Sequence, residues 1–426
     1  MPGAERELES LFRHEGGRIC AWLVRLLGPG RLDLIEDAVQ DAFSAALAQW
    51  PFEGTPRHPA AWLAVAARNK ALDRLRRDAR LDSLDVEGEA AAWRLGFSNP
   101  EDSGRPDDTL ALMFVACHPA LSLEEQTMLT LQTVCGLNPR EIGRSFLSTP
   151  EAVTQRLVRA KRRIRELELR FEIPEGGELA ARLPGLLNAI YLLFTRGYTA
   201  AEGEPLMAQE LCAEGLRLAT LLTEHPATAT PEAHALAALI CLHHARAAAR
   251  TGTGGDLIVL ADQDRSLWDR ELIARGFGHM QLAMRGDVLT ALHLEAGIAS
   301  VHAAARSFEE TDWDTLARHY RSLLEVKPTP VVRLNAAIAC AYAESPAAGL
   351  AQLEPLESVA KLARYAPYHA ARGELLLKVG RAVEAGESLR RALACDLNGA
   401  ERAYLTRKLR DCGTGTTASA RPADHS

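Results

Sequence analysis

Apolar residues recur with helical spacing along most of the chain. Residues 5–27 form one amphipathic stretch, which ends at the strong stop sequence GPG. A second stretch covers 32–50, and a third covers 59–77 after a proline-rich loop at 51–59. The pattern therefore predicts three helices, separated by two sharp breaks, at the N-terminal end of the chain.

The second of these helices has two chemically different sides. Its apolar side contains Leu34, Ala38, Phe43, Ala46 and Leu47. Its polar side contains Glu36, Asp37, Gln40 and Asp41. The third helix carries positive charge instead, in the stretch RNKALDRLRRDAR at 68–80. Adjacent acidic and basic faces suggest two partners, one cationic and one nucleic acid, although ordinary surface helices would show the same pattern.

Residues 82–108 have the composition of a linker. They are acidic, contain scattered glycine and proline, and lack clear periodicity apart from a short helix near 90–94. A second helical block begins at about residue 109 and continues to about 171.

Three helix starts can be located in the second block. They are Ser122 with Glu125, Asn138 followed by Pro139, and Ser148 with Glu151. The helix over 139–146 is short, the turn after it is tight, and the next helix is long. This order is typical of a helix-turn-helix, whose second helix enters the major groove of DNA.

The long helix is basic on one side and apolar on the other. Its apolar positions are Val153, Leu157, Ala160 and Ile164, and its basic residues are Arg156, Arg159, Lys161, Arg162, Arg163 and Arg165. Thr154, Gln155 and Arg159 point outward near the helix start, where base edges are reached, and the later arginines are placed for phosphates. The alternative is a solvated basic face, against which the helix caps and the short preceding helix count.

From a hinge-like segment at 173–178 onward, helix follows helix. One run of small and apolar residues has the separations of the tetratricopeptide (TPR) pattern: Gly373, Leu376, Gly380, Ala385, Leu389 and Ala392. A partial copy contains Ala336, Ala339 and Ala348. We therefore expect helical hairpins from about 180 to 410, followed by a disordered tail at 413–426.

The composition agrees with a helical globular protein. The 426 residues exceed one ordinary core, so roughly two to four domains are expected. Hydrophobic residues make up 47% and aromatic residues only 5%, which favours packed helices. The net charge is -7, yet positive charge is concentrated at 68–80 and 156–165. Any nucleic-acid surface must therefore be a local patch.

The residues indicate no catalytic site, metal site or cofactor. The eight cysteines form no CxxC pair, so reduced buried thiols are expected. His243 and His244 lack a partner motif, and the acids at 262, 264 and 269 have no metal-loop spacing. No run approaches the roughly 18 apolar residues that span a bilayer, and the N-terminus does not resemble a signal peptide. A soluble, cytoplasmic protein that is not an enzyme is expected.

Together the two helical blocks resemble regions 2 and 4 of bacterial RNA polymerase sigma factors of the extracytoplasmic-function group, group IV of the sigma-70 family. The resemblance rests on DLIEDAVQDAF at 33–43, PAAWLAVAARNKALDRLRR at 59–77, LSLEEQTMLTL at 121–131 and STPEAVTQRLVRAKRRIR at 148–165. It implies an all-α chain with region 2 at 1–81, an acidic linker at 82–108, a region 4 helix-turn-helix at 109–172, a TPR-like regulatory domain at 173–412 and a tail at 413–426.

The resemblance also implies roles for particular residues. Glu36, Asp37, Gln40 and Asp41 would bind the β′ clamp helices of core RNA polymerase, whose β flap is a further expected contact. In the loop at 51–59, Arg57 and His58 would hold a flipped base of the −10 promoter element. The melted strand and its upstream duplex would contact Arg68, Asn69, Arg76 and Arg77. The −35 element would contact Thr154, Gln155, Arg156, Arg159 and Arg163.

Three positions depart from the family pattern. Thr154 stands where the family usually has a basic residue, and Gln155 where it usually has a small hydroxyl residue. Because glutamine pairs well with adenine, an unusual −35 preference is expected. Gly143 replaces the usual alanine, at a cost of about 1 kcal/mol in a helix interior.

The residues beyond 172 resemble the long TPR-like extension of one sigma subgroup. The resemblance lies in LLNAIYLLFTRGY at 186–198, ADQDRSLWDRELIARG at 261–276 and TDWDTLARHYRSLL at 311–324. It implies regulation by the extension, with a regulatory protein as a partner. Asp264, Arg265 and Trp268 are candidates for a regulatory site, although a helix start with a capping aspartate and a buried tryptophan explains them as well.

Two main functions remain open at this point, beside a weaker third in which the chain is an interaction scaffold whose basic helix binds nothing. The first is a sigma factor that binds core polymerase, recognises the −35 and −10 elements and is regulated by its own C-terminal helices. The second is a stand-alone helix-turn-helix regulator with an effector-binding or protein-binding module. The block at 33–77 favours the first, because a simple regulator does not need an acidic polymerase-binding helix followed by a base-capturing loop.

Overall fold

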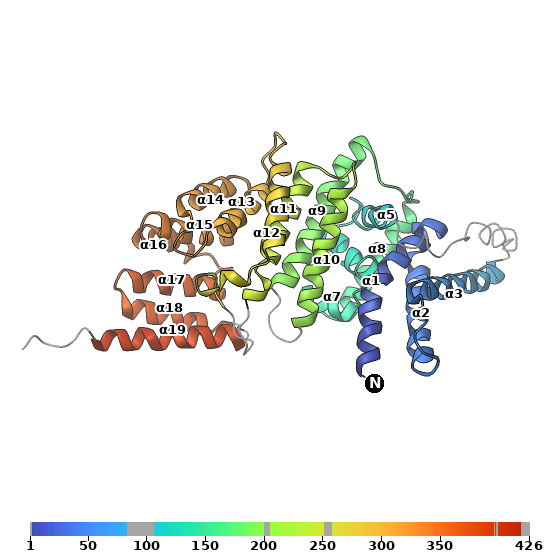
Figure 1. The fold of residues 1–426 in the computed structure, drawn as a ribbon, viewed down its shortest axis with the longest axis horizontal. Coiled ribbons are helices and arrows are strands. Elements are labelled where there is room, and N and C mark those ends of the chain that lie inside the picture. Colours follow the sequence, from blue (N-terminus) through green and yellow to red (C-terminus); the bar gives the residue numbers. More distant parts are fainter. Residues whose placement is uncertain are drawn as a thin grey trace, which may run out of the picture. The chain divides into compact units, whose positions relative to one another are not determined.

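The computed structural model describes residues 2–82, 106–146, 148–199, 205–250, 258–395, 397 and 399–418. These ranges contain α-helices and short 3-10 helices and no strand, which confirms the all-helical fold class (Figure 1). The chain divides into two compact units. The N-terminal unit comprises Met1–Gly197 and Glu210–Ala229, and the C-terminal unit comprises Tyr198–Gln209 and Thr230–Ser426.

The N-terminal unit is built from ten helices and turns of the described chain. They are α1 (Pro2–Leu27), η1 (Pro29–Arg31), α2 (Leu32–Glu53), α3 (Pro59–Asp82), α5 (Pro106–Ala116), α6 (Leu123–Thr133), α7 (Pro139–Phe146), α8 (Pro150–Glu166) and most of α9 (Gly176–Thr199) and α10 (Pro205–Glu224). The expected stop at GPG is confirmed, with Gly28 at φ 84°. The expected linker lies mostly outside the described residues, as does its short helix at 90–94.

Helix α2 is longer than expected, and its buried side matches the expected stripe except at its end. The proline-rich segment does not begin as a loop, because Pro51 and Phe52 belong to the last turn of α2, which ends at Glu53 and is followed by the cap residue Gly54 with φ 87°. The helix buries Leu32, Ile35, Glu36, Ala38, Val39, Ala42, Phe43 and Ala46. Leu47 is 49% exposed, so its expected place in the apolar stripe is wrong. Ala38, Phe43 and Ala46 are buried as expected, and Ile35, Val39 and Ala42 are buried in addition.

The caps of the second block are confirmed at two of three positions. Ser122 and Glu125 form a capping box, and the side chain of Asn138 accepts hydrogen bonds from the backbone of Arg140 and Glu141. The third start is wrong by one residue, because Thr149 rather than Ser148 caps α8. Pro150 takes the first helical position, and the residue before it must therefore provide the cap.

The sequence predicted a domain boundary at residue 172, but neither compact unit begins or ends there. Helix α9 packs on α6, since a Cβ at Gly185 would lie 2.7 Å from Gln126 Oε1. The guanidinium of Arg196 lies over the ring of Phe146 in α7, at 5.4 Å from its centroid. The first part of the expected regulatory domain thus belongs to the same unit as the helices that precede it.

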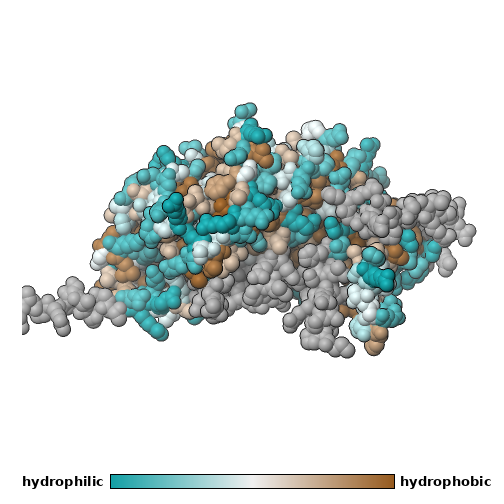
Figure 2. Space-filling model, viewed as in Figure 1, coloured by the Kyte–Doolittle hydropathy of each residue, from teal (hydrophilic) through white to brown (hydrophobic). Residues whose placement is uncertain are grey.

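The C-terminal unit is a chain of helices in which each contacts the next. It contains α11 (Pro231–His244), η3 (Ala247–Ala249), η4 (Leu260–Asp262), η5 (Arg265–Leu267), α12 (Arg270–Ala283), α13 (Ala291–Ala304), α14 (Trp313–Val326), α15 (Pro330–Ala343), α16 (Pro346–Leu353), η6 (Glu354–Leu356), α17 (Ala366–Lys378), α18 (Ala382–Leu393) and α19 (Gly399–Ala418). Consecutive packing from α11 to α19 is visible in Figure 1. Hydrophilic side chains predominate on the face shown in Figure 2, with apolar ones scattered among them.

Small residues bring neighbouring helices of this unit close together. A Cβ at Gly373 in α17 would lie 3.0 Å from the side chain of Leu389 in α18, and Gly380 turns the chain between them with φ 81°. In the partial copy, Gly349 rather than Ala348 is at the close contact. A Cβ there would lie 2.4 Å from that of Ala341.

The tail was expected to begin at residue 413, but α19 continues to Ala418. Residues 413–418 belong to α19, because adding residues to an existing helix costs little once packed residues such as Leu405 hold it. Residues 419–426 lie outside the described part. All eight cysteines are buried and unpaired by disulfides, as expected. Among the described residues no helix is both long and apolar enough to cross a membrane.

Candidate functional site

The expected polymerase-binding acids lie on α2 beside α3. Gln40 and Asp37 are exposed and Asp41 is partly exposed. Arg74 of α3 forms ion pairs with Asp37 and with Asp41, in the latter case with Nη2 at 2.8 Å from Oδ2. Hydrogen bonding to Asp41 and then to Asp37 outweighs partial burial and raises the pKa of Arg74. These three side chains line a polar recess, together with Leu34 and Arg77.

Glu36, the fourth of these residues, is not on that exposed face. It is 8% exposed, and its carboxylate forms a buried ion pair with Lys161 of α8. Burial raises the pKa of Glu36 to about 7, and the ammonium of Lys161 lowers it only in part. Burial also opposes the charge of Lys161, but the carboxylates of Glu36 and Asp33 raise its pKa on balance.

A second basic residue of α8 reinforces this contact. Arg165 Nε donates to the carbonyl of Gly30 at 3.1 Å, and Arg165 Nη2 donates to Asp33 Oδ2 at 2.8 Å. Lys161 Nζ lies 3.5 Å from Asp33 Oδ1. Because 161 and 165 are four residues apart, both fall on one side of α8. This side of the basic helix therefore faces η1 and α2 in the N-terminal unit.

Other contacts join the first three helices to the second block. A Cβ at Gly17 of α1 would lie 1.9 Å from the carbonyl oxygen of Val134, just after α6. Arg25 Nε lies 3.4 Å from Asp108 Oδ2 in α5. Only glycine allows so close an approach at position 17, so α1 and the end of α6 are packed backbone against backbone.

The segment between α2 and α3 presents exposed side chains for contact with a base. Arg57 and His58 are exposed, as a base-binding role requires. The segment is anchored by Trp50 and Trp62, whose rings meet edge to face at 5.5 Å. Phe52, which the sequence did not single out, is 89% exposed. Phe52, in the last turn of α2, and Arg57 and His58 after it are all exposed side chains of kinds that can stack on or hydrogen-bond an unpaired base.

The expected strand-binding residues of α3 are at least partly exposed. Arg68 donates to the side-chain oxygen of Asn69 at 3.1 Å and 3.2 Å. Arg76 pairs with Asp73 at 3.2 Å, and Arg77 donates to the backbone carbonyl of Asp73 at 3.4 Å. These contacts are local and solvent-exposed, so phosphate groups can replace them at little cost.

The other side of α8 is exposed and basic. Val153, Leu157, Ala160 and Ile164 are buried as expected. Thr154, Gln155, Arg159 and Arg163 are exposed. The hydroxyl of Thr154 donates to the carbonyl of Pro150 at 2.8 Å, so this group offers acceptor lone pairs outward. Arg156 forms an ion pair with Glu124 of α6.

The candidates in the C-terminal unit fall into two groups. Asp264 accepts a hydrogen bond from the backbone of Ser266 at 2.8 Å and caps η5, and Trp268 is 2% exposed. Both observations agree with the alternative interpretation, a helix start with a capping aspartate and a buried tryptophan. Arg265 differs, because it is only 7% exposed, which the sequence did not indicate.

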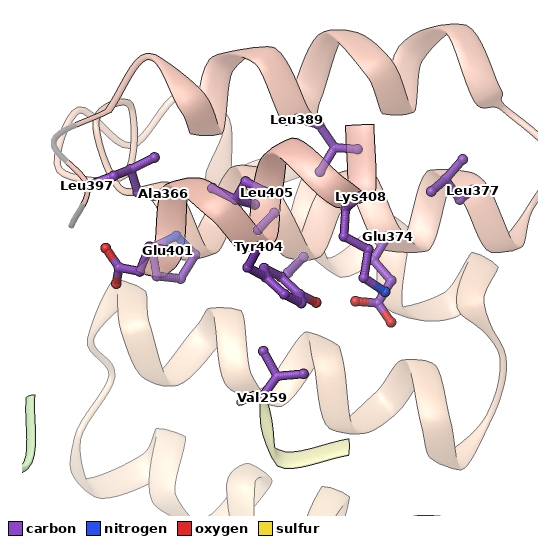
Figure 3. A pocket seen from close by; sticks show the side chains of 13 residues that line it. Val259, Ala366, Glu374, Leu377, Leu389, Leu397, Glu401, Tyr404, Leu405 and Lys408 are labelled. Carbon is purple, nitrogen blue, oxygen red and sulfur yellow. The ribbon is translucent and has the colours of Figure 1, made fainter. Parts of the chain in front are cut away.

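A separate apolar pocket lies among α17, α18 and α19. It has a volume of about 280 Å³, and its lining includes Ala370, Leu389, Tyr404 and Leu405, with Glu374 and Lys408 also among the lining side chains (Figure 3). None of the sequence-predicted site residues lines it. In the described part of the chain no group of three histidine, cysteine or acidic side chains could hold a metal ion.

Comparison with known proteins identifies two regions of the chain. Residues 11–81 match the family Sigma-70 region 2, and residues 182–284 match DUF6596, a family of unknown function. An uncharacterized protein of Rhizobium meliloti (strain 1021) is 40% identical over 388 residues, covering 89% of this chain and 90% of that protein. The chain therefore belongs to the family of this Rhizobium protein, with a sigma-70 region 2 domain at its N-terminus and a helical DUF6596 region after it.

Proposed function

We propose that the chain is a sigma factor that binds core RNA polymerase and directs it to promoters with both a −35 and a −10 element. The region 2 match at 11–81 carries this proposal. Region 2 is a binding domain, so the chain would act through polymerase and DNA rather than as an enzyme. A stand-alone helix-turn-helix regulator would not need the acidic face of α2 or the exposed segment after it, because neither is required to bind duplex DNA.

Core polymerase would bind α2 through Asp37, Gln40 and Asp41. Arg74 holds the two carboxylates in place beside α3. A cationic polymerase surface would compete with this partly exposed arginine, which costs little because ion pairs near the surface contribute about 1 kcal/mol or less. Glu36 is buried against Lys161 and would reach polymerase only after α8 moves away.

The −10 element would bind the segment between α2 and α3. A base flipped from the non-template strand would stack on Phe52, with Arg57 and His58 beside it. The basic residues of α3 would contact the neighbouring phosphates.

The −35 element would bind the exposed side of α8, as region 4 of a sigma factor. Thr154 and Gln155 are uncharged and exposed near the helix start, so they would supply sequence choice. Arg156, Arg159 and Arg163 would supply salt-dependent affinity through phosphates.

The N-terminal unit would be a closed form of the sigma factor. The two promoter elements are centred about 25 base pairs apart, which is about 85 Å along B-form DNA. In the N-terminal unit, however, α8 contacts η1 and α2 directly through Lys161 and Arg165. One chain cannot read both elements in this arrangement, so α8 would separate from α2 when polymerase and promoter bind. Helices α9 and α10, which pack on the same unit, would influence that equilibrium.

Binding to core polymerase tests the proposal. We expect the full chain to form a complex with core enzyme that Asp37→Ala with Asp41→Ala weakens at least about tenfold, because two charge-assisted contacts are lost. Asp73→Ala, an acid on the exposed face of α3, is the matched control. Equal affinity in the double variant and the control would contradict the assignment of α2.

A further inference from the structure

Two arginines of the C-terminal unit, Arg246 and Arg265, have no acidic partner within the described ranges. Arg265 is 7% exposed and Arg246 is half-buried. In the described part of the chain neither forms an ion pair with a carboxylate. Glu309 and Glu310 act on Arg265 only from a distance. Charged groups buried without a counter-charge are costly, and proteins seldom keep them without a ligand or partner.

The two guanidinium groups meet at one tryptophan. The Cζ atom of Arg265 lies 4.7 Å from the ring centroid of Trp268, and that of Arg246 lies 5.3 Å from it. Trp268 itself is 2% exposed. The ring therefore holds both cations near one another, where their charges repel.

Two donors in this cluster have no acceptor among the described residues. Nη1 of Arg265 donates to the carbonyls of His302 and Ala305, each at 2.7 Å. Nη2 of Arg265 and Nε1 of Trp268 are buried and have no hydrogen-bond partner among the described residues. Nε of Arg246 donates to Gln263 Oε1 at 3.3 Å. An unsatisfied buried donor requires an explanation, and an absent ion is one of the few available.

The electrostatic environment agrees with an excess of positive charge. Burial, followed by the charges of Arg246 and Arg265, lowers the pKa of His302 to about 4. Burial and the charge of Arg246 also lower the pKa of Arg265. A negative group placed here would relieve both effects.

We propose that Arg246, Arg265 and Trp268 form a binding site for a small oxyanion, the phosphate or carboxylate group of a soluble molecule. Guanidinium groups match both oxyanions through paired N–H donors. The indole N–H of Trp268 would be one further hydrogen-bond donor to the anion. The size limit follows from burial: Arg265 and Trp268 are more than nine-tenths buried, so the site would admit only a small group.

Calorimetric titration of the full chain with sodium phosphate and, separately, sodium acetate tests the site, with sodium chloride holding ionic strength constant. We expect saturable binding of at least one anion, and the tighter of the two identifies the class of ligand. Arg246→Met should weaken binding about tenfold to a hundredfold, because a charge-assisted contact is lost. Trp268→Phe keeps the ring and removes only the N–H, so a smaller, severalfold loss is expected.

The matched control is Arg333→Met, which removes an exposed arginine of α15 in the same unit and should leave the affinity unchanged. Circular dichroism and thermal unfolding of each variant show that the unit is folded. No saturable binding of either anion up to about 10 mM, a range that covers weak metabolite sites, would overturn the proposal. So would equal affinity in Arg246→Met and the native chain.

Discussion

Lys161 in α8 forms a buried ion pair with Glu36 in α2, 125 residues earlier in the chain. Their side chains are only 8% and 9% exposed. The pair joins the helix proposed to read the −35 element to the helix proposed to bind polymerase. Under the proposed function, it would hold the N-terminal unit in a form that cannot span a promoter.

Replacing one partner of this pair should destabilise the N-terminal unit. Lys161→Met leaves the buried Glu36 carboxylate without its cation, and we expect a loss of about 3 kcal/mol in the free energy of unfolding. Glu36→Gln in the same chain should recover much of that loss, because no charge then stays buried. Denaturant titration of the single and double variants measures both effects.

Arg162→Met is the control for this experiment, because Arg162 is exposed and its pair with Glu166 should contribute less than about 0.5 kcal/mol. Equal unfolding free energies for the two single variants would show that the pair at Lys161 is not buried in solution.

The C-terminal unit should lose stability in acid. Burial, followed by nearby cationic groups, lowers the pKa of His243 to about 3 and that of His302 to about 4. Below the ordinary histidine pKa of 6.5 the unfolded chain takes up protons that the folded unit does not. Stability is therefore highest above pH 6.5 and falls as the pH drops toward 4, by up to about 1.4 kcal/mol per pH unit for each group. His302→Gln should flatten the profile of thermal unfolding between pH 7.5 and pH 5; an unchanged slope would contradict the stated cause.

Gly143→Ala should destabilise α7 and the turn after it. A Cβ at this position would lie 2.7 Å from the carbonyl oxygen of Ser148, so the turn must shift. The expected loss is about 1–3 kcal/mol, which exceeds the gain of about 1 kcal/mol from helix propensity. Gly278→Ala in α12 is the matched control, because nothing lies within 4 Å of its Cβ and a small gain is expected. A higher thermal unfolding temperature in both variants would show that the turn after α7 can shift at little cost in free energy.

Truncation should separate the role of α9 and α10 from that of the later helices. These two helices bury Leu186, Leu187, Ile190 and Leu218 within or beside the N-terminal unit. A chain that ends at Phe171 therefore exposes apolar surface, and we expect it to aggregate or unfold. A chain that ends at Ala229 keeps this core and should show a cooperative thermal transition. If the shorter chain unfolds with the same transition, α9 and α10 do not stabilise the unit.

The local features of the sequence predicted much of the fold. The stop after α1 and the caps at Ser122 and Asn138 depend on neighbouring residues only, and all three are found. The cap of α8 was misplaced because Ser148 and Thr149 are both capable residues. Pro150, which decides between them, was present in the sequence and could have corrected the prediction.

The features that depend on distant contacts could not be predicted. Glu36 has the same local pattern as Asp37 and Asp41, and only the approach of Lys161 makes it a buried residue. Arg74 belongs to a basic stretch of α3, yet it faces the acids of α2 rather than solvent alone. Arg265 has no local signal of burial, because its contacts come from the end of α13, almost forty residues later.

The sigma-factor proposal can be tested most directly by transcription with core RNA polymerase reconstituted with the full chain, on a library of promoter sequences. We expect transcripts from templates that share one −35 and one −10 sequence at fixed spacing. We also expect that Gln155→Ala changes the preferred −35 sequence while the −10 preference stays the same. Binding to duplex DNA by the chain alone, with no promoter-specific transcript when core polymerase is present, would contradict the proposal.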